Sequence, residues 1–340
     1  MKTLLCSLAA SALLIAPASM DAQTVTKVGT TAAKFLSIPV GARALGMGGA
    51  FTAVASDASA LYWNPAGAAR LVNTEAMFSH AEWIADMSHD FGGVVVPLAD
   101  FGTVGLSFTA LNTAEMERTT VQEPEGTGQF FDAGSFAVTL TYARNLTEWF
   151  SIGLNAKYVQ EYIWNSSATG FAVDIGTLFN TPFPGVRFGA GISNFGTKMQ
   201  IEGDDLIVLQ DITPANGNNP NINANLGTDA FDMPLILRIG LAYEPIADED
   251  QLLTLVGDWL VPSDNSQAVS LGAEYQLLQR ILAIRAGYRA LGMRDSEEEF
   301  TLGAGVRYFA TPTLGLKFDY AYEQFGRLKS VHKFTVAVLF

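Results

Sequence analysis

Hydrophobic and polar residues alternate with a period of two along most of the chain. Between residues 314 and 323, one face carries Leu, Leu, Phe, Tyr and Tyr, and the other carries Gly, Lys, Asp, Ala and Glu. Such alternation is typical of a β-strand with one apolar face, because successive side chains point to opposite sides. Fourteen segments show the pattern, the first two less regularly than the others. The predicted strands are 74–82, 88–98, 102–112, 133–144, 149–162, 168–180, 185–194, 232–245, 251–261, 267–277, 280–289, 297–308, 313–323 and 331–340.

The length of these segments indicates that they cross a membrane. Most of them have 9–12 residues. A tilted transmembrane strand needs ~9–11 residues, whereas strands of soluble proteins average ~5–6. The even count, the aromatic residues near strand ends and the terminal Phe340 are also typical of outer-membrane barrels. We therefore predict an all-β fold, a transmembrane antiparallel β-barrel of about 14 strands, over residues 73–340.

The connections between the segments test this count independently. If both ends of the barrel chain face the periplasm, the even-numbered connections are periplasmic turns and should be short. All of them are short, and the two long connections, 113–132 and 195–231, both fall at odd, extracellular positions. A wrong strand count would scramble this asymmetry.

The alternative fold is a large soluble β-sandwich or a periplasmic lectin, which would also alternate. Its exposed face would be heavily charged, but here the polar face is rich in Gly, Ala, Ser and Thr. The charged fraction is 16%, below the ~25% usual for soluble domains. The net charge of −14 also argues against a nucleic-acid partner, because phosphate contacts need a basic surface.

Residues 1–22 have the features of a signal peptide. Lys2 precedes a short apolar run over residues 3–15, and small residues follow, with cleavage expected near Ala18 or Ala22. We therefore expect export to the bacterial outer membrane. The single cysteine, Cys6, lies in this segment, so the mature chain would offer no zinc–sulfur site. We expect neither a metal nor a cofactor.

Residues 23–72 precede the first strand and do not alternate. Small residues dominate, so the backbone can pack closely in a confined lumen, and we predict a plug segment. A short helix is expected over residues 57–61, capped by Ser56 or Asp57, with a turn at residues 64–67. The candidate plug motif consists of glycines and turn-forming residues: Gly46, Gly48, Gly49, Asp57, Asn64, Pro65 and Gly67.

The run GARALGMGGAFTAVASDASALYWNPAG at residues 41–67 resembles the N-terminal signature of the PorV/PorQ family, which is similar to the FadL group of outer-membrane proteins. The resemblance extends over essentially the whole mature chain. It implies a fourteen-stranded barrel with an N-terminal plug. Further matching segments are LGAEY at 271–275, IRAGYR at 284–289, LGAGV at 302–306, FDYAY at 318–322 and a His-x-Phe at 332–334.

Two functions follow from this resemblance. PorV is a component of the type IX secretion system and receives substrates with a C-terminal sorting domain. A docking or shuttle role in type IX secretion is therefore our main hypothesis. FadL relatives carry hydrophobic compounds across the outer membrane, so a FadL-like transporter is the alternative. Expected partners are outer-membrane lipid, secreted proteins or secretion-system subunits at the extracellular loops, and a hydrophobic ligand in the lumen.

Two features could be mistaken for enzyme chemistry. The Gly46–Gly49 run resembles a dinucleotide loop, but that motif must follow a strand and open the helix of a βαβ unit, so plug packing is favoured.

His80 and His332 lie on the first and last strands, which become neighbours when the barrel closes. Catalysis would require a serine and an orienting carboxylate as well, and no histidines have metal-ligand spacing. We predict a structural role at the membrane interface and no enzymatic activity.

The charges on the polar faces carry more information. Five of each sign predict a mutually paired interior rather than an ion-selective pore. Electrostatic bracing of barrel and plug is the favoured interpretation, and a polar site for a translocated ligand is the alternative. The residues expected to point inward are Arg238, Arg285, Arg289, Arg307, Lys317, Glu244, Asp258, Glu274, Asp319 and Glu323.

Overall fold

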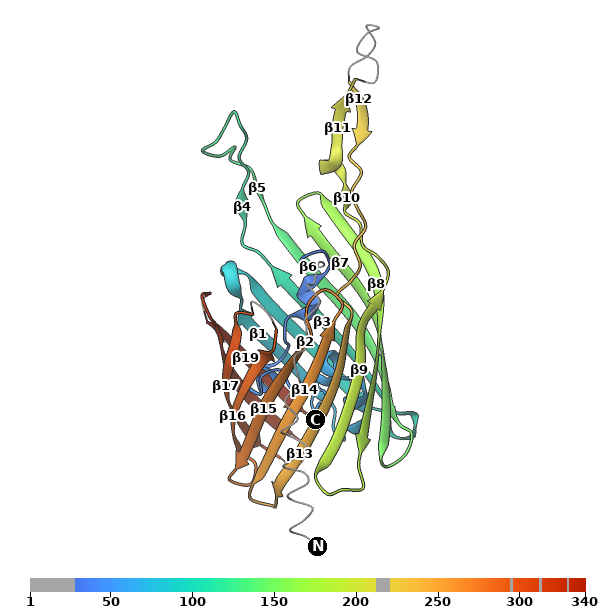
Figure 1. The fold of residues 1–340 in the computed structure, drawn as a ribbon, viewed down its shortest axis with the longest axis vertical. Coiled ribbons are helices and arrows are strands. Elements are labelled where there is room, and N and C mark those ends of the chain that lie inside the picture. The colour runs from blue at the N-terminus through green and yellow to red at the C-terminus, as the bar shows by residue number, and fades with distance from the viewer. Residues whose placement is uncertain (1–27, 212–220, 294–295, 312–313, 329) are drawn as a thin grey trace.

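The long strands form a closed antiparallel sheet in a computed structural model that describes residues 28–211, 221–293, 296–311, 314–328 and 330–340. In these residues fourteen strands close into a barrel, because β9 pairs with both β8 and β13 (Figure 1). The strands are β1 (Glu75–Glu82), β2 (Ser88–Pro97), β3 (Thr103–Asn112), β6 (Ala133–Asn145), β7 (Phe150–Ile163), β8 (Ser166–Asn180), β9 (Val186–Gly196), β13 (Ile236–Ala247), β14 (Leu252–Pro262), β15 (Ala268–Leu277), β16 (Leu282–Leu291), β17 (Glu298–Phe309), β18 (Gly315–Phe325) and β19 (Val331–Leu339).

The structure confirms the predicted antiparallel barrel of fourteen strands, and each strand overlaps one predicted segment. The first and last strands pair, with Glu75 opposite Leu339. The largest shift is in β13, which begins at Ile236 rather than at residue 232. Pro234 lies in between, and because a proline has no N–H to donate to a ladder, the strand starts after it.

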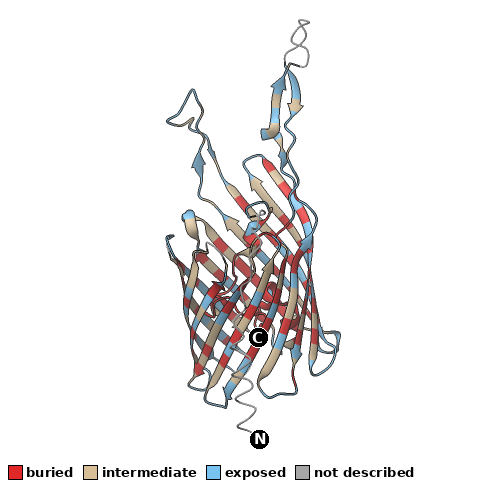
Figure 2. Cartoon of the chain, in the orientation of Figure 1, coloured by how far each residue is buried: buried red, intermediate tan, exposed pale blue. Residues whose placement is uncertain are grey.

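Side chains alternate between the outside of the barrel and the lumen. Leu140 and Phe171 point outward and remain 62% exposed, whereas their neighbours Thr139 and Ala172 are buried inside. Figure 2 shows this alternation of burial along the strands. The apolar faces predicted from the sequence therefore form the outer surface, as a lipid environment requires.

The connections differ in length at the two ends of the barrel. One end has short turns, including η4 (Ala99–Phe101), and we call it the periplasmic end. Both long connections extend beyond the other, extracellular end (Figure 1). They carry small elements, and η3 lies in a shorter loop at the same end: η3 (Ile84–Asp86), β4 (Met116–Glu117), β5 (Phe130–Phe131), β10 (Glu202–Gly203), η5 (Asp204–Leu206), β11 (Ile207–Gln210) and β12 (Ile222–Asn225).

Residues 31–70, which we call the plug, run through the lumen from the extracellular to the periplasmic end (Figure 1). At the extracellular end, Glu161 of β7 accepts a hydrogen bond from the Ala33 amide. At the periplasmic end, Arg70 donates to Ser151 Oγ. The plug contains η1 (Lys34–Ser37), α2 (Ala42–Gly46), α3 (Ala60–Trp63) and η2 (Pro65–Arg70). Among the described residues, none of the helices has the length and apolar character needed to cross a membrane. The signal peptide predicted at residues 1–22 lies outside the described residues.

The prediction of a helix over residues 57–61 was wrong by about one turn. Helix α3 spans Ala60–Trp63, and Ser59 is its N-cap residue. The Asp57 carboxylate accepts hydrogen bonds from the amide and hydroxyl of Ser59, so it closes a local turn and the helix begins after it. Likewise, residues 64–67 are no isolated turn, because Asn64 caps the 3₁₀-helix η2 and Pro65 occupies its first turn.

The lower plug contacts the barrel wall backbone to backbone. A Cβ atom on Gly272 would overlap the carbonyl of Met47, and one on Gly287 would overlap the amide of Gly48. Because no side chain fits between plug and wall at these positions, the two surfaces meet at the closest possible distance. Among the described residues, wall glycines facing the plug occur on nine strands, at Gly93, Gly105, Gly153, Gly176, Gly189, Gly240, Gly272, Gly287 and Gly303.

Candidate functional site

The glycines of the candidate plug motif serve packing. Gly46 ends α2, where a Cβ would come within 3.0 Å of the Gly303 Cα. Gly48 and Gly49 have φ of +67° and +70°, a left-handed conformation that favours glycine. A Cβ on Gly67 would overlap the carbonyl of Ala55. These glycines therefore pack against other parts of the plug and against the barrel wall.

The polar residues of the motif join parts of the plug to one another and to the wall. Asn64 Nδ2 donates to the carbonyls of Thr52 and Thr177, at 2.9 and 3.0 Å. Pro65 lies against Gly176 of β8. Asp57 accepts a hydrogen bond from Arg43 at 3.1 Å. The polar residues of the motif therefore hold the plug in place within the lumen through hydrogen bonds and packing contacts.

The luminal charges around Glu274 form a chain of ion pairs. Its carboxylate forms ion pairs with Arg43 Nη2 of the plug at 2.8 Å and with Arg285 Nε of β16 at 2.6 Å. Arg285 Nη1 contacts Asp319 of β18 at 2.6 Å. Glu274 is fully buried, so removal of either guanidinium would leave charge in a low-dielectric site. This chain ties helix α2 to three strands.

The other predicted charges also lie inside the barrel, each in its own surroundings. Arg289 contacts Glu323 at 2.5 Å and Glu298 at 3.1 Å. Lys317 contacts Glu75 at 2.8 Å, and Glu244 pairs with Arg187.

Asp258 accepts hydrogen bonds from the amides of Phe51 and Thr52 and from the Thr52 hydroxyl. Arg238 donates to Ser193 and stands over the rings of Tyr62 and Trp63. Arg307 lines a narrow cavity at the periplasmic end, and among the described residues it forms no ion pair.

Sequence reasoning missed several luminal charges. Lys157 pairs with Asp174 at 2.8 Å between β7 and β8, and Lys333 donates to the Pro39 carbonyl of the plug. Alternation within their strands would have found these three residues. Arg43 gave no such signal, because the plug has no sequence period that assigns a side chain to a face.

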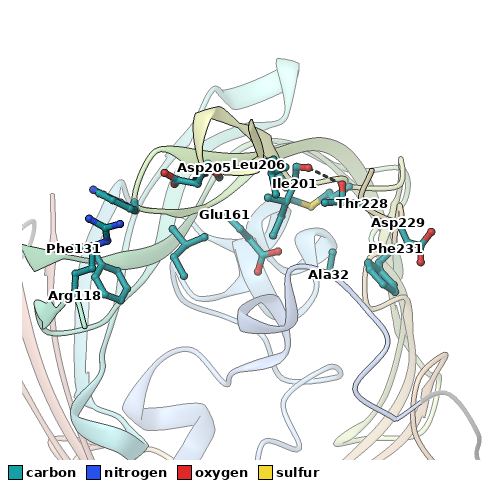
Figure 3. A pocket seen from close by; sticks show the side chains of 15 residues that line it. Ala32, Arg118, Phe131, Glu161, Ile201, Asp205, Leu206, Thr228, Asp229 and Phe231 are labelled. Carbon is teal, nitrogen blue, oxygen red and sulfur yellow. Dashed lines mark hydrogen bonds between the residues drawn. The ribbon is translucent and has the colours of Figure 1, made fainter. Parts of the chain in front are cut away.

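An apolar cavity of about 610 Å³ opens above the plug at the extracellular end (Figure 3). The plug supplies Ala32, the ends of β7 and β8 with the turn between them supply one wall, and the two long connections supply the other walls. Its aromatic side chains come from three separate segments: Phe131, Trp164 and Phe231. This composition, mostly apolar with a few polar groups, is typical of a site for a small hydrophobic ligand.

The polar groups of the cavity are held by hydrogen bonds. Glu161 accepts a hydrogen bond from the Ala33 amide at 2.9 Å. Asp205 accepts hydrogen bonds from the Asn165 amide at 2.9 Å and from the Ser166 hydroxyl at 3.2 Å. Thr228 donates to the Ile201 carbonyl at 2.7 Å, as drawn in Figure 3. The extracellular loops therefore form an ordered rim.

The floor of the cavity continues into a buried apolar cluster. Met199 lines the cavity and packs with Phe35 and Leu36 of η1 and with Met233. Below them, the Tyr62 hydroxyl donates to the Leu36 carbonyl at 3.1 Å. Apolar side chains therefore lead from the cavity to the upper surface of the plug.

Next to this floor, the barrel wall changes its pairing. The β9–β13 ladder runs as far as Ser193 opposite Ile236, and Asn194 has a φ of +64° at a bulge opposite β8. Among the described residues, the next pairing between these segments is the bridge of Met199 with Phe231. In this part of the described chain, the Asn194 side chain donates to the Pro234 carbonyl at 3.0 Å, and no ladder closes the wall. We call this stretch, residues 194–198 beside 232–235, the seam.

The three histidines lie apart from this cavity. His80 contacts Asp90 at 2.7 Å, and His332 contacts the Tyr320 hydroxyl at 2.7 Å, both on the outer face. His89 is buried in the lumen. Within the described ranges, no group of three or more histidines, cysteines or carboxylates is arranged to hold a metal ion.

Comparison with known proteins places this geometry in context. The model of an uncharacterised protein family, UPF0164, matches residues 8–157, and no curated protein matches the chain. A Pseudomonas aeruginosa FadL homologue matches with a TM-score of 0.56 at 13% identity, over 89% of this chain and 98% of that one. The chain has the fold of FadL-type outer-membrane barrels. That fold agrees with an outer-membrane location.

Two further structures support this assignment of the fold. The Pseudomonas putida toluene transporter TodX matches with a TM-score of 0.57 at 12% identity, over 88% of this chain and 97% of that one. The Ralstonia pickettii toluene transporter TbuX matches with a TM-score of 0.55 at 12% identity, with the same coverage. These similar structures are transporters rather than enzymes. The PorV/PorQ resemblance stays a prediction.

Proposed function

We propose that this barrel lets a hydrophobic small molecule cross the outer membrane. The observation that carries the proposal is the extracellular cavity of about 610 Å³, whose apolar floor leads down to the plug. A water-filled channel for polar solutes would need a polar, open lumen, whereas the lower plug is packed against wall glycines. The alternative named in the sequence analysis, FadL-like transport, thus has more support than secretion docking.

The similar structures lend support from outside the chain. TodX and TbuX are toluene transporters, and the Pseudomonas aeruginosa protein is a FadL homologue. At 12–13% identity these matches speak for the fold, and the proposed cargo rests on the cavity.

The proposed route leaves the lumen sideways. A ligand in the cavity reaches Met199 and Met233, which pack on the inner side of the wall at Gly170. The seam lies beside these two methionines, and methionine side chains repack easily around irregular ligands. We infer that the ligand passes there into the membrane, because the plug below is held by buried ion pairs and glycine contacts.

Binding of the neutral fluorophore N-phenyl-1-naphthylamine to the purified barrel in non-ionic detergent tests the proposal. Ile163→Trp and Ala168→Trp add bulk to the cavity lining and should weaken binding at least tenfold. Leu140→Trp adds the same bulk on the outer face and is the matched control, with unchanged binding expected. Equal affinity in all three variants, or no binding to the native chain, would overturn the proposal.

A second candidate function is docking of secreted proteins, as the PorV/PorQ resemblance implies. The observation in its favour is the exposure of apolar side chains on the long extracellular connections: Val121 is 94% exposed and Leu209 64%. Affinity purification of the tagged protein from native membranes tests it. Recovery of secretion-channel subunits or sorting-domain proteins supports docking, and recovery of lipid alone contradicts it.

A further inference from the structure

We propose that the extracellular cavity selects hydrophobic cations, such as protonated amines with an apolar body, over hydrophobic anions of the same size. This inference rests on the proposed function, because it specifies the cargo of the same cavity. It starts from the charges on the lining. Three carboxylates face or border the cavity, from Glu161, Asp205 and Asp229, and Arg118 is the one cation among the described lining residues (Figure 3).

The hydrogen-bond donors that contact Glu161 and Asp205 are all neutral groups. Within the described part of the chain, Glu161 accepts hydrogen bonds only from a backbone amide and the Ser135 hydroxyl. The described partners of Asp205 are Asn165 and Ser166. Among the described residues, neither these two nor Asp229 forms an ion pair. Neutral donors stabilise a carboxylate without cancelling its field, so the cavity remains electronegative.

The lower lumen shows the opposite arrangement in the same molecule. There Glu274 lies between two guanidinium groups, and Glu323 contacts Arg289. These two buried carboxylates are therefore paired with arginine. At the cavity, a bound cationic ligand would supply the positive charge that the carboxylates lack.

The aromatic side chains of the cavity favour the same kind of ligand. The Arg118 guanidinium stands 5.2 Å from the centre of the Trp164 ring, and its Nη1 donates to Gln129 at 2.7 Å. The protein thus already places a cation on one aromatic face of the site. Phe131 and Phe231 also line the cavity, and an aromatic ring attracts an ammonium group placed over its face through the ring quadrupole.

The surroundings extend this electronegative field outward. The connection 113–132 has five acidic residues and one basic residue, and the connection 195–231 also has five and one. Each therefore carries a net charge of −4, and both project from the extracellular end (Figure 1). Such a field raises the local concentration of cations and lowers that of anions.

Competition among three molecules with one apolar body tests the inference. 4-Phenylbutylamine, 4-phenylbutan-1-ol and 4-phenylbutanoate would displace N-phenyl-1-naphthylamine from the purified chain in non-ionic detergent at low salt. We expect the amine to bind at least tenfold more tightly than the carboxylate, with the alcohol between them. At 0.5 M NaCl the difference should shrink several-fold, because salt screens exposed charges.

A charge-removing variant locates the effect. Asp229→Asn alters an exposed side chain, so the fold is not at risk, and Glu161→Gln keeps an acceptor for the Ala33 amide. Together they should reduce the ratio of the affinity for the amine to the affinity for the carboxylate at least threefold. Asp100→Asn at a periplasmic turn should leave this ratio unchanged.

The outcomes separate this inference from the proposed function. If the alcohol and the fluorophore fail to bind, the transport proposal itself falls. If the alcohol binds and the carboxylate binds as tightly as the amine, only the charge selectivity is overturned. The charge selectivity would also be overturned if neither salt nor the double variant changed the ratio of the affinities for the amine and the carboxylate.

Discussion

The two halves of the plug meet the barrel in different ways. From Gly46 to Gly67 the plug touches wall glycines directly, and Arg43 joins it to a buried carboxylate. Around Ala32, in contrast, it leaves a cavity of about 610 Å³ beneath two long connections. A wall glycine against plug backbone leaves no room for a side chain, whereas apolar side chains on loops leave adaptable space. The comparison distinguishes a tightly packed seal below from the proposed ligand site above.

The largest expected effect comes from adding a side chain to the seal. Gly287→Val places its Cβ on the amide of Gly48, a backbone atom that cannot move aside. We expect a loss of about 3 kcal/mol or more in the free energy of unfolding, measured by denaturant titration in lipid vesicles. Gly257→Val on β14 is the control, because its nearest neighbour is a flexible Leu271 methyl at 3.3 Å. Equal losses in both variants would show that the seal is not tightly packed.

The next effect tests the electrostatic part of the seal. Glu274→Ala leaves Arg43 and Arg285 buried beside each other without their shared carboxylate. Removing one partner of a buried pair typically costs about 3–5 kcal/mol, and planar-bilayer recordings should then show openings that the native barrel lacks. Glu82→Ala, an exposed residue on the outer face of β1, should change neither property. A silent recording together with native stability would contradict the bracing role.

A smaller effect is expected at the upper end of the plug. Asp264 receives Lys34 Nζ at 2.6 Å and the Thr31 hydroxyl at 2.9 Å, but the Lys34 side chain is 56% exposed. Solvent screens this pair, so Asp264→Ala should cost about 1 kcal/mol. Limited proteolysis should find residues 28–38 more accessible, with residues 42–67 still protected. Equal cleavage of both stretches would mean that the plug moves as one unit.

The smallest effect concerns the cavity lining alone. Arg118→Ala removes the guanidinium from the Trp164 ring and leaves the barrel wall untouched. An exposed cation–π contact contributes about 0.5–1 kcal/mol, so the stability of the barrel should barely change. Affinity for 4-phenylbutylamine should rise, because the ring face becomes free and one positive charge is lost. A fall in affinity for the amine would contradict the proposed role of that ring.

The sequence predicted the wall better than its contents, for a physical reason. Alternation assigns each strand residue to a face, so all fourteen strands and the inward positions of residues such as Arg285 could be read without coordinates. The ion-pair partners depend on contacts between distant segments: Arg43 and Glu274 are 231 positions apart. The plug has no period of two, and this explains why α3 was placed one turn too early.

The cavity was beyond sequence reasoning altogether. Its lining comes from the plug, from strand ends and from two connections without a repeating pattern. The contact of Ala33 with Glu161, which joins the plug to β7, spans 128 positions. A weak signal existed in the apolar residues Phe131, Trp164 and Phe231, which are unusual in otherwise polar loops.

Hydrogen–deuterium exchange of the barrel in lipid nanodiscs, with and without saturating N-phenyl-1-naphthylamine, tests the central claim most directly. If the cavity binds the ligand above a fixed seal, exchange should change in residues 31–38, 196–206 and 228–235. Exchange in residues 42–67 should stay the same. Altered exchange in residues 42–67, or no change around the cavity, would contradict the account.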